Sequence, residues 1–320
     1  MKEQEFKLLA PAKATEIAQA AHRAGDLALA EMLYGWLLEA HPDHAEALHF
    51  LGVLLHQRDR SEAAIGMIRR SIELDQPRPD WQNDLGNVLA ERQHLSAAAE
   101  AFMASLELEP NNEVVWNNLG AILQRQEQHD EAAFSYRQAI ALSPEFIDAL
   151  SNLGNLLAAQ GETRESAEYL CRAFIAAATE ATPKDQLGIA YYTLGRVDEA
   201  KEVYREWLLE EPDNPIAAHL YAACSGQNIP SRASDAYVER HFDELAESFE
   251  EQLVEKLDYR APGLIGQVLA RHALPQRNFN VLDAGCGTGL CGVQISQYAS
   301  RLTGIDLSSN MLAQAEQKRV

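Results

Sequence analysis

The chain has 320 residues, of which 48 are Asp or Glu and 27 are Lys or Arg, so its formal net charge at pH 7 is −21. Because affinity for phosphate comes from clustered Lys and Arg, this balance disfavours nucleic acid as a partner of the whole surface. The composition, 47% hydrophobic and 23% charged, excludes a disordered or collagen-like chain. The length indicates about two domains.

Targeting segments and metal-ligand patterns are missing from the sequence. No stretch reaches the roughly 18 consecutive apolar residues of a membrane helix, and residues 1–25 carry charges throughout, unlike a signal peptide. The cysteines do not have the spacing of zinc ligands, and two of them stand five residues apart: Cys171, Cys224, Cys286 and Cys291. We therefore expect a cytoplasmic protein with reduced thiols, no contact with membranes and no bound metal.

The first two thirds of the chain repeat one pattern every 34 residues. A Leu-Gly pair marks each unit, with the glycine at Gly52, Gly86, Gly120, Gly154 and Gly188. Twelve residues after each glycine stands Ala or Ser, and sixteen residues after it stands a larger apolar residue: Ile68, Phe102, Tyr136, Leu170 and Tyr204. A fixed period of this length is typical of a solenoid of helical hairpins, in which small residues let the two helices approach closely.

The pattern resembles the tetratricopeptide repeat. Extending the register back by one period gives six repeats over residues 11–214. Pro183 falls inside what should be the first helix of the last repeat, so we expect that repeat to be shortened at its start. Residues 215–235 are expected to form a closing helix, over 216–224, and a linker.

Asparagines recur on the predicted first helices, which in such a solenoid line a concave groove. They lie close to the Leu-Gly pairs: Asn83, Asn117, Asn118, Asn152 and Asn155. A ladder of amides can pair with the backbone of an extended peptide, and this pattern resembles the superhelix of the O-linked N-acetylglucosamine transferases. The alternative is a hydrated polar surface without a ligand, because Phe50 and Asp84 occupy the equivalent places in two repeats.

The last third of the chain changes character. Residues 237–258 predict an acidic amphipathic helix, with apolar residues at helical spacing, and residues 263–272 predict a second helix. A strand is predicted over 280–283, a helix over 290–298 and another strand over 302–306, with a glycine-rich loop after the first strand. This is the order of a βαβ unit.

A glycine loop at this place lets backbone amides and a helix N-terminus approach a nucleotide-like ligand, while the acid that ends the second strand, Asp306, can accept bonds from ribose hydroxyls. Residues 287–292 satisfy the pattern GxGxxG, and Asp306 follows Gly287 by 19 residues, as a nicotinamide dinucleotide requires. A dinucleotide is therefore one of two competing cofactors.

The strings VLDAGCGTG and GIDLSSNML favour the other cofactor, because together they resemble the motifs of class I S-adenosylmethionine-dependent methyltransferases. The resemblance implies that Asp283 lies near the ammonium group of S-adenosyl-L-methionine, where a dinucleotide's pyrophosphate would be repelled. It also implies that the cofactor lies against the bare backbone of Gly285, Gly287 and Gly289. Asp306 would bind its ribose, and Leu307 and Met311 would contact its adenine. A helix that carries Phe242, Phe249 and Tyr259 would fold over the cofactor as a lid.

The expected fold is thus an all-α tetratricopeptide solenoid followed by a partial α/β Rossmann-like domain over 236–320. Only 40 residues follow Asn280, so the resemblance implies that the acceptor-binding half is absent, that no catalytic residue can be named, and that this chain is inactive alone. The leading hypothesis is a methyltransferase whose repeats recruit a protein partner or substrate. The alternatives are a repeat adaptor or scaffold with a vestigial methyltransferase segment, and a dinucleotide oxidoreductase.

Overall fold

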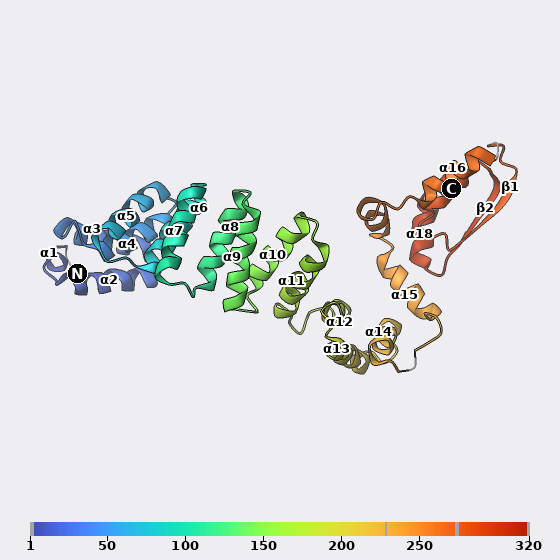
Figure 1. Ribbon diagram of the computed structural model, residues 1–320, viewed down its shortest axis with the longest axis horizontal. Coiled ribbons are helices and arrows are strands. Elements are labelled where there is room, and N and C mark those ends of the chain that lie inside the picture. The colour runs from blue at the N-terminus through green and yellow to red at the C-terminus, as the bar shows by residue number, and fades with distance from the viewer. Residues whose placement is uncertain (1–2, 228, 273–274, 319–320) are drawn as a thin grey trace. The chain divides into compact units, whose positions relative to one another are not determined.

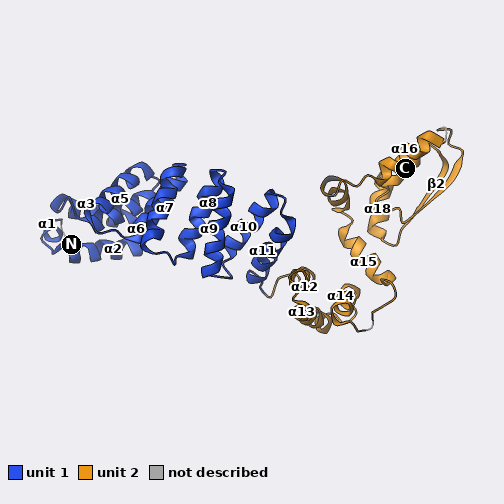
Figure 2. Cartoon of the chain, in the orientation of Figure 1, with its two compact units in different colours: residues 1–179 blue, residues 180–320 orange. Residues whose placement is uncertain are grey.

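The computed structural model describes residues 3–227, 229–272 and 275–318. Within it the chain forms two compact units, Met1–Thr179 and Glu180–Val320 (Figure 2). The boundary between them falls inside the predicted repeat region. The predicted division of the chain at 11–214, 215–235 and 236–320 remains a prediction, and residues 228, 273, 274, 319 and 320 of it lie outside the described residues.

Unit 1 is built of helices that pair in chain order as antiparallel hairpins (Figure 1). The hairpins are α2 (Pro11–Arg23) with α3 (Leu27–Ala40), α4 (Ala45–Gln57) with α5 (Ser61–Leu74), α6 (Pro79–Glu91) with α7 (Leu95–Leu108), α8 (Glu113–Arg125) with α9 (His129–Leu142), and α10 (Ile147–Ala159) with α11 (Thr163–Ala176). A short helix that the repeat pattern did not predict, α1 (Glu3–Lys7), packs the buried Phe6 against the Trp36 ring of α3.

In unit 1, each hairpin from α4 to α11 is closed by the glycine of its first helix, which lies against the large residue sixteen positions later, whereas α2 has Ala18 in place of the glycine. A Cβ atom on Gly120 would lie 2.7 Å from the Tyr136 ring, and one on Gly86 would lie 2.6 Å from the Phe102 ring. Real Cβ atoms do not approach other atoms that closely, so only glycine permits this packing. The predicted hairpins of the solenoid are confirmed.

The turn inside each hairpin also repeats. A residue with positive φ recurs at the same place of every repeat: Gly25, Asp59, Gln93, Glu127, Gly161 and Gly195. Three of these six residues carry side chains in the left-handed region, which is costly for all residues but glycine. Helix packing on both sides of the turn therefore imposes the same backbone conformation on different residue types.

Unit 2 begins with a sixth hairpin, α12 (Lys184–Thr193) with α13 (Val197–Glu210), in which Gly188 packs against the Tyr204 ring. α12 begins directly after Pro183 and has 10 residues, where the first helices of unit 1 have 13, as predicted. The predicted closing helix is α14 (Pro215–Ser225), which packs on α13.

The remainder of unit 2 contains a mixed arrangement of helices and strands (Figure 1). Its elements are α15 (Asp235–Leu245), the π-helix η1 (Glu251–Lys256), α16 (Ala261–His272), β1 (Phe279–Ala284), α17 (Leu290–Ile295), β2 (Ala299–Ile305) and α18 (Ser309–Gln317). β1 and β2 are parallel neighbours, with Asp283 opposite Gly304 and Ala284 opposite Ile305. The predicted βαβ unit is confirmed, as a partial Rossmann-like arrangement of the described residues.

The single helix predicted over 237–258 is wrong. α15 ends at Leu245, where the Ser248 N–H donates to the Leu245 carbonyl three residues back instead of four, and η1 follows. The periodicity of apolar residues continues across this break, which is why the sequence suggested one helix. The tighter turn redirects the chain, and Asp243 before the break and Glu250 after it contact Ser308 and Lys318 at the two ends of α18.

Replacing Gly120 by alanine tests the closure of the hairpins. We expect Gly120→Ala to lower the free energy of unfolding by about 1 to 3 kcal/mol, because the new methyl group overlaps the Tyr136 ring. Gly66→Ala is the matched control, because a Cβ on Gly66 in α5 meets nothing within 4 Å, and it should raise stability by up to about 1 kcal/mol through helix propensity. Urea denaturation of the two variants measures the difference, and equal behaviour would contradict the close approach.

Candidate functional site

The loops that follow β1 and β2 lie together, because the carboxyl ends of parallel strands meet at one edge of a sheet. The Gly285 and Cys286 N–H groups both donate to the Ile305 carbonyl, at 2.8 and 3.0 Å. Gly285, Gly287 and Gly289 have φ values of +76°, +53° and +80°, in the region that favours glycine. The alternating glycines therefore shape the loop as well as leaving its backbone bare.

Asp306 holds the two loops to each other. Its Oδ2 atom accepts a hydrogen bond from the Gly287 N–H at 2.8 Å, and its Oδ1 atom accepts one from the Ser308 N–H at 3.0 Å. A carboxylate has about four acceptor positions, so about two remain for further donors. Asp306 thus combines a structural role in the loops with capacity for a ligand.

A cavity of about 530 Å³ opens at this edge, within the size range of small-molecule sites. Five of the seven residues predicted for the cofactor line it: Gly285, Gly287, Asp306, Leu307 and Met311. Two of the three predicted lid residues, Phe242 and Phe249, line it as well, whereas Tyr259 does not. The structure therefore gathers most of the predicted site around one hollow.

The two predicted residues that do not line the cavity have other surroundings. The Oδ2 atom of Asp283 is buried and has no hydrogen-bond partner among the described residues. Gly289 precedes the first residue of α17, and a Cβ atom on it would lie 3.1 Å from the Ala315 Cβ atom of α18. Gly289 thus allows close packing, while Asp283 carries an unsatisfied buried oxygen, which is costly unless a donor or cation reaches it.

An aromatic wall covers the cavity opposite the glycine loop. The ring centroids of Phe242 and Phe249 lie 6.1 Å apart at an interplanar angle of 74°, and the Phe249 ring faces Gly287. Val238, four residues before Phe242 in α15, lines the cavity too. Sequence reasoning missed Val238, although the same helical spacing that indicated Phe242 would have included it.

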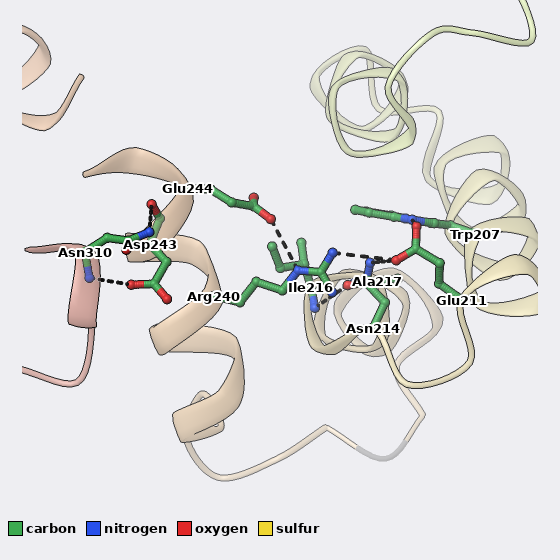
Figure 3. A network of polar contacts seen from close by, with 9 residues as sticks. All are labelled: Trp207, Glu211, Asn214, Ile216, Ala217, Arg240, Asp243, Glu244 and Asn310. Carbon is green, nitrogen blue, oxygen red and sulfur yellow. Dashed lines mark hydrogen bonds and ion pairs between the residues drawn. The ribbon is translucent and has the colours of Figure 1, made fainter. Parts of the chain in front are cut away.

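Asp243 attaches α15 to the start of α18. Its carboxylate accepts hydrogen bonds from Ser308 Oγ at 2.5 Å and from the Asn310 N–H at 3.1 Å, while Asn310 Nδ2 donates to its carbonyl. Figure 3 shows the contact between Asp243 and Asn310. These bonds, led by that from Ser308, hold the pKa of the Asp243 carboxyl below its usual value. Sequence reasoning missed this residue, because nothing in the local pattern pairs it with a position 65 residues later.

The opposite part of the wall is held by Glu250. Lys318, near the end of α18, forms an ion pair with Glu250 and donates to the Thr288 carbonyl in the glycine loop. Burial by itself would raise the pKa of the Glu250 carboxyl, but the hydrogen bond from Lys318 lowers it below its usual value. The wall is therefore attached to α18 on both sides of the break between α15 and η1.

The other face of α15 contacts the last repeat. The Arg240 guanidinium lies 3.6 Å from the Glu211 carboxylate, which also accepts hydrogen bonds from Trp207 Nε1 and Asn214 Nδ2 (Figure 3). The Tyr237 ring stacks on His219 of α14 with centroids 4.0 Å apart. One helix of unit 2 thus touches both the closing helix of the repeats and the cavity.

The predicted asparagine ladder in unit 1 forms bonds within the protein. Asn152 Nδ2 donates to Asn117 Oδ1 at 3.0 Å, and Asn118 Nδ2 donates to the Oδ1 atom of Asn87, a residue the sequence did not single out. Each bond joins the first helices of successive repeats, as does the 3.2 Å pair of His49 with Asp84. These amides therefore connect neighbouring hairpins.

The other predicted asparagines have no such bond among the described residues. Asn155 is exposed, and the Oδ1 atom of Asn83 is buried without a partner. Of the five, only Asn118 lines the cavity of about 470 Å³ on the face formed by α4, α6 and α8. A role of the five asparagines in binding a peptide stays a prediction.

Comparisons with protein families agree with both parts of the chain. A family model for a methyltransferase domain matches residues 281–320, and models for tetratricopeptide repeats match residues 15–79, 101–133, 125–161 and 184–214. The chain joins tetratricopeptide repeats to a methyltransferase segment. No curated protein is significantly similar to it in sequence.

Solved structures resemble the repeats. MamA 41-end from Desulfovibrio magneticus RS-1 superimposes with a TM-score of 0.51 at 17% identity, covering 54% of this chain and 97% of that one. A crystal structure of MamA gives 0.48 at 24% identity, covering 50% and 94%. YrrB, described as a TPR protein with an unusual peptide-binding site, gives 0.48 at 21% identity, covering 51% and 84%. At these identities the likeness concerns the fold of the repeats.

Two further properties concern the described part of the chain. None of its helices combines the length and the apolar character that crossing a bilayer requires. The four cysteines form no disulfide, and burial raises the pKa of Cys224, Cys286 and Cys291, which favours the protonated thiol.

Removing the Asp243 carboxylate tests the attachment of the wall. We expect Asp243→Ala to speed hydrogen exchange in the first turn of α18 about tenfold, because bonds to a charged acceptor are lost. Since the pKa of Asp243 is lowered, the contact should persist at neutral pH and weaken as the pH falls through that lowered value.

Glu244→Ala is the control for this experiment, because Glu244 lies on the same helix and pairs only with Arg240 among the described residues. It should leave exchange in α18 unchanged. Equal effects of the two variants on α18 would contradict the role of Asp243.

Proposed function

We propose that the protein is an S-adenosylmethionine-dependent methyltransferase whose tetratricopeptide repeats recruit a protein partner or substrate. The observation that carries the proposal is the cavity at the carboxyl edge of β1 and β2, lined by the glycine loop, Asp306, Leu307 and Met311. The match of residues 281–320 to a methyltransferase model supports it. When bound, the cofactor supplies an electrophilic methyl group on a sulfonium.

The charges of the site fit this cofactor. The buried Oδ2 atom of Asp283 has no hydrogen-bond partner in the described part of the chain, and a buried carboxylate is stabilised by a cation that it can bond. S-adenosylmethionine carries an ammonium and a sulfonium, whereas the pyrophosphate of a dinucleotide would add negative charge beside Asp283 and Asp306. We therefore assign Asp283 to the ammonium group and disfavour a nicotinamide dinucleotide.

The remaining assignments follow from the position of each residue around the cavity. Asp306 keeps about two acceptor positions for the ribose hydroxyls beside its bonds to Gly287 and Ser308. Leu307 and Met311 offer apolar contacts for adenine, and Phe242 and Phe249 exclude water from the opposite side. These residues bind and orient the cofactor, and we assign no residue of this chain to the acceptor.

The repeats would hold the protein partner. We place a peptide on the face formed by α4, α6 and α8, where a cavity of about 470 Å³ lies, and along the neighbouring α10. The five predicted asparagines are candidate contacts, of which Asn118 lines that cavity. The net charge of −21 disfavours nucleic acid in this role. Four cysteines that form no disulfide suit a reducing compartment, and we place the protein in the cytoplasm.

Two ligands separate the proposed roles of the carboxylates. S-adenosylmethionine carries the amino-acid group, whereas 5′-methylthioadenosine has the same nucleoside without it. We expect Asp306→Ala to weaken binding of both ligands about 10- to 100-fold, because each uses the ribose. Asp283→Asn should weaken binding of S-adenosylmethionine by a similar factor and leave binding of 5′-methylthioadenosine unchanged. Isothermal titration calorimetry on the full chain measures both affinities.

Glu316→Gln serves as the charge-matched control, because Glu316 is exposed on α18. It should bind both ligands as the unaltered chain does. The proposal is wrong if the unaltered chain binds reduced nicotinamide dinucleotide more tightly than S-adenosylmethionine. Absence of binding by either cofactor would instead favour an adaptor with a vestigial methyltransferase segment.

A further inference from the structure

Unit 1 carries a second hollow, on a different side of α8 from the cavity of the first helices. It lies between α7 and α9, has a volume of about 890 Å³, and shares no residue with the other cavity. Its apolar surface includes Trp116, Phe134 and Met103. Phe134 and Met103 are 56% and 46% exposed. We call this hollow the α7–α9 groove.

The aromatic part of the groove is held in place. Trp116 Nε1 donates to the Pro110 carbonyl at 2.8 Å, and the Trp116 and Phe134 rings meet edge to face with centroids 6.0 Å apart. Rings that are already ordered lose little conformational freedom when a ligand packs on them. The groove is therefore pre-formed for an apolar side chain.

The repeat register indicates that Phe134 is not required by the fold. One period before and after it stand Glu100 and Glu168, both exposed. The hairpin accommodates a charged residue at this place on either side, as an outward-facing position of a helix normally does. The exposed phenylalanine is thus specific to this repeat.

Met103 departs from the register in the same way, with a consequence for charge. One period before and after it stand Arg69 and Arg137, and Arg137 pairs with Glu165 at 2.9 Å. One repeat earlier, the positions equivalent to Arg137 and Glu165 are occupied by Met103 and Glu131. Where the later repeat has an ion pair, the groove has an exposed thioether and a carboxylate that forms no ion pair with a described residue.

Charge around the groove has one sign. Its lining includes the carboxylates of Glu100, Glu107, Asp130 and Glu131 and no Lys or Arg. None of the four forms an ion pair with a described residue, although Glu31, Glu62 and Glu165 of the same unit pair with arginines. An apolar floor with an acidic rim is complementary to a basic segment that carries large apolar side chains.

We propose that the α7–α9 groove binds a basic segment of a partner protein, which inserts an apolar side chain beside Phe134 and Met103 and places Lys or Arg against the acidic rim. This surface is additional to the peptide face formed by α4, α6 and α8. A second copy of the chain is disfavoured as the occupant, because each copy carries a net charge of −21.

The test uses a fluorescein-labelled synthetic peptide of lysine and leucine, with lysine–serine and glutamate–leucine peptides for comparison. Fluorescence anisotropy on the full chain measures the dissociation constants. The lysine–leucine peptide should bind at least about tenfold more tightly than either comparison peptide, because both the apolar anchor and the positive charge contribute.

The register supplies variants that neighbouring repeats already tolerate. Phe134→Glu should weaken binding of the lysine–leucine peptide about tenfold or more, although the variant adds negative charge. Met103→Arg should weaken binding to a similar extent, because it removes the apolar contact and repels the peptide's positive charge. Glu100→Gln with Glu131→Gln should weaken binding about threefold to tenfold, with the difference disappearing at high salt. Circular dichroism checks that the helices remain.

Glu145→Gln with Glu168→Gln removes two exposed acids outside the groove lining and is the matched control. The proposal fails if this control weakens binding of the peptide as much as Glu100→Gln with Glu131→Gln does, because general attraction to an acidic surface would then explain the binding. It fails too if Phe134→Glu and Met103→Arg bind normally. If the chain self-associates and Met103→Arg abolishes that self-association, the groove binds a second copy of the chain and the proposed partner is wrong.

Discussion

The close approach of two helices at a glycine is the constraint on which the repeats depend. In each hairpin from α4 to α13, a ring or branched aliphatic side chain occupies the space that a Cβ atom of that glycine would fill. The glycine weakens helix propensity, and the packing against it offsets that cost. Since the contact recurs at every period, it fixes the spacing inside each hairpin and leaves the outward positions free to vary.

That freedom explains how one scaffold carries two different surfaces. On the first helices, polar pairs such as Asn117 with Asn152 link successive repeats and hold them in register. On the second helices, outward positions usually hold charged residues, and Met103 and Phe134 replace them in one pair of neighbouring hairpins. Apolar residues at outward positions can thus line a groove without disturbing the hairpin core, because the core does not involve them.

In unit 2 the helix α15 has an analogous double role. Its Arg240 and Tyr237 contact the last hairpin and the closing helix, while Phe242 faces the cavity and Asp243 bonds the start of α18. The cavity wall is consequently attached to the last hairpin and the closing helix as well as to α18. Because helices outside the sheet hold this wall in place, an arrangement with two strands can enclose a cavity large enough for a small molecule.

The sequence by itself determined the elements whose signals are local. The 34-residue period, the glycine with its partner sixteen residues later, and the strand–glycine loop–helix–strand order all appear in the structure. The cavity lining was also largely predictable, because parallel strands bring Gly285, Gly287 and Asp306 to one edge regardless of the rest of the chain. Each of these depends on contacts within one repeat or one βαβ unit.

Only the tertiary structure decided which polar groups satisfy each other. Asn117 and Asn118 turned out to bond asparagines of adjacent repeats, and Asp243 bonds α18 across 65 residues of sequence. The break after Leu245 and the unpaired Oδ2 atom of Asp283 likewise depend on neighbours distant in the chain. Hydrogen bonds are short and directional, so a periodic pattern can place a polar side chain on a helix face without determining which partner it meets.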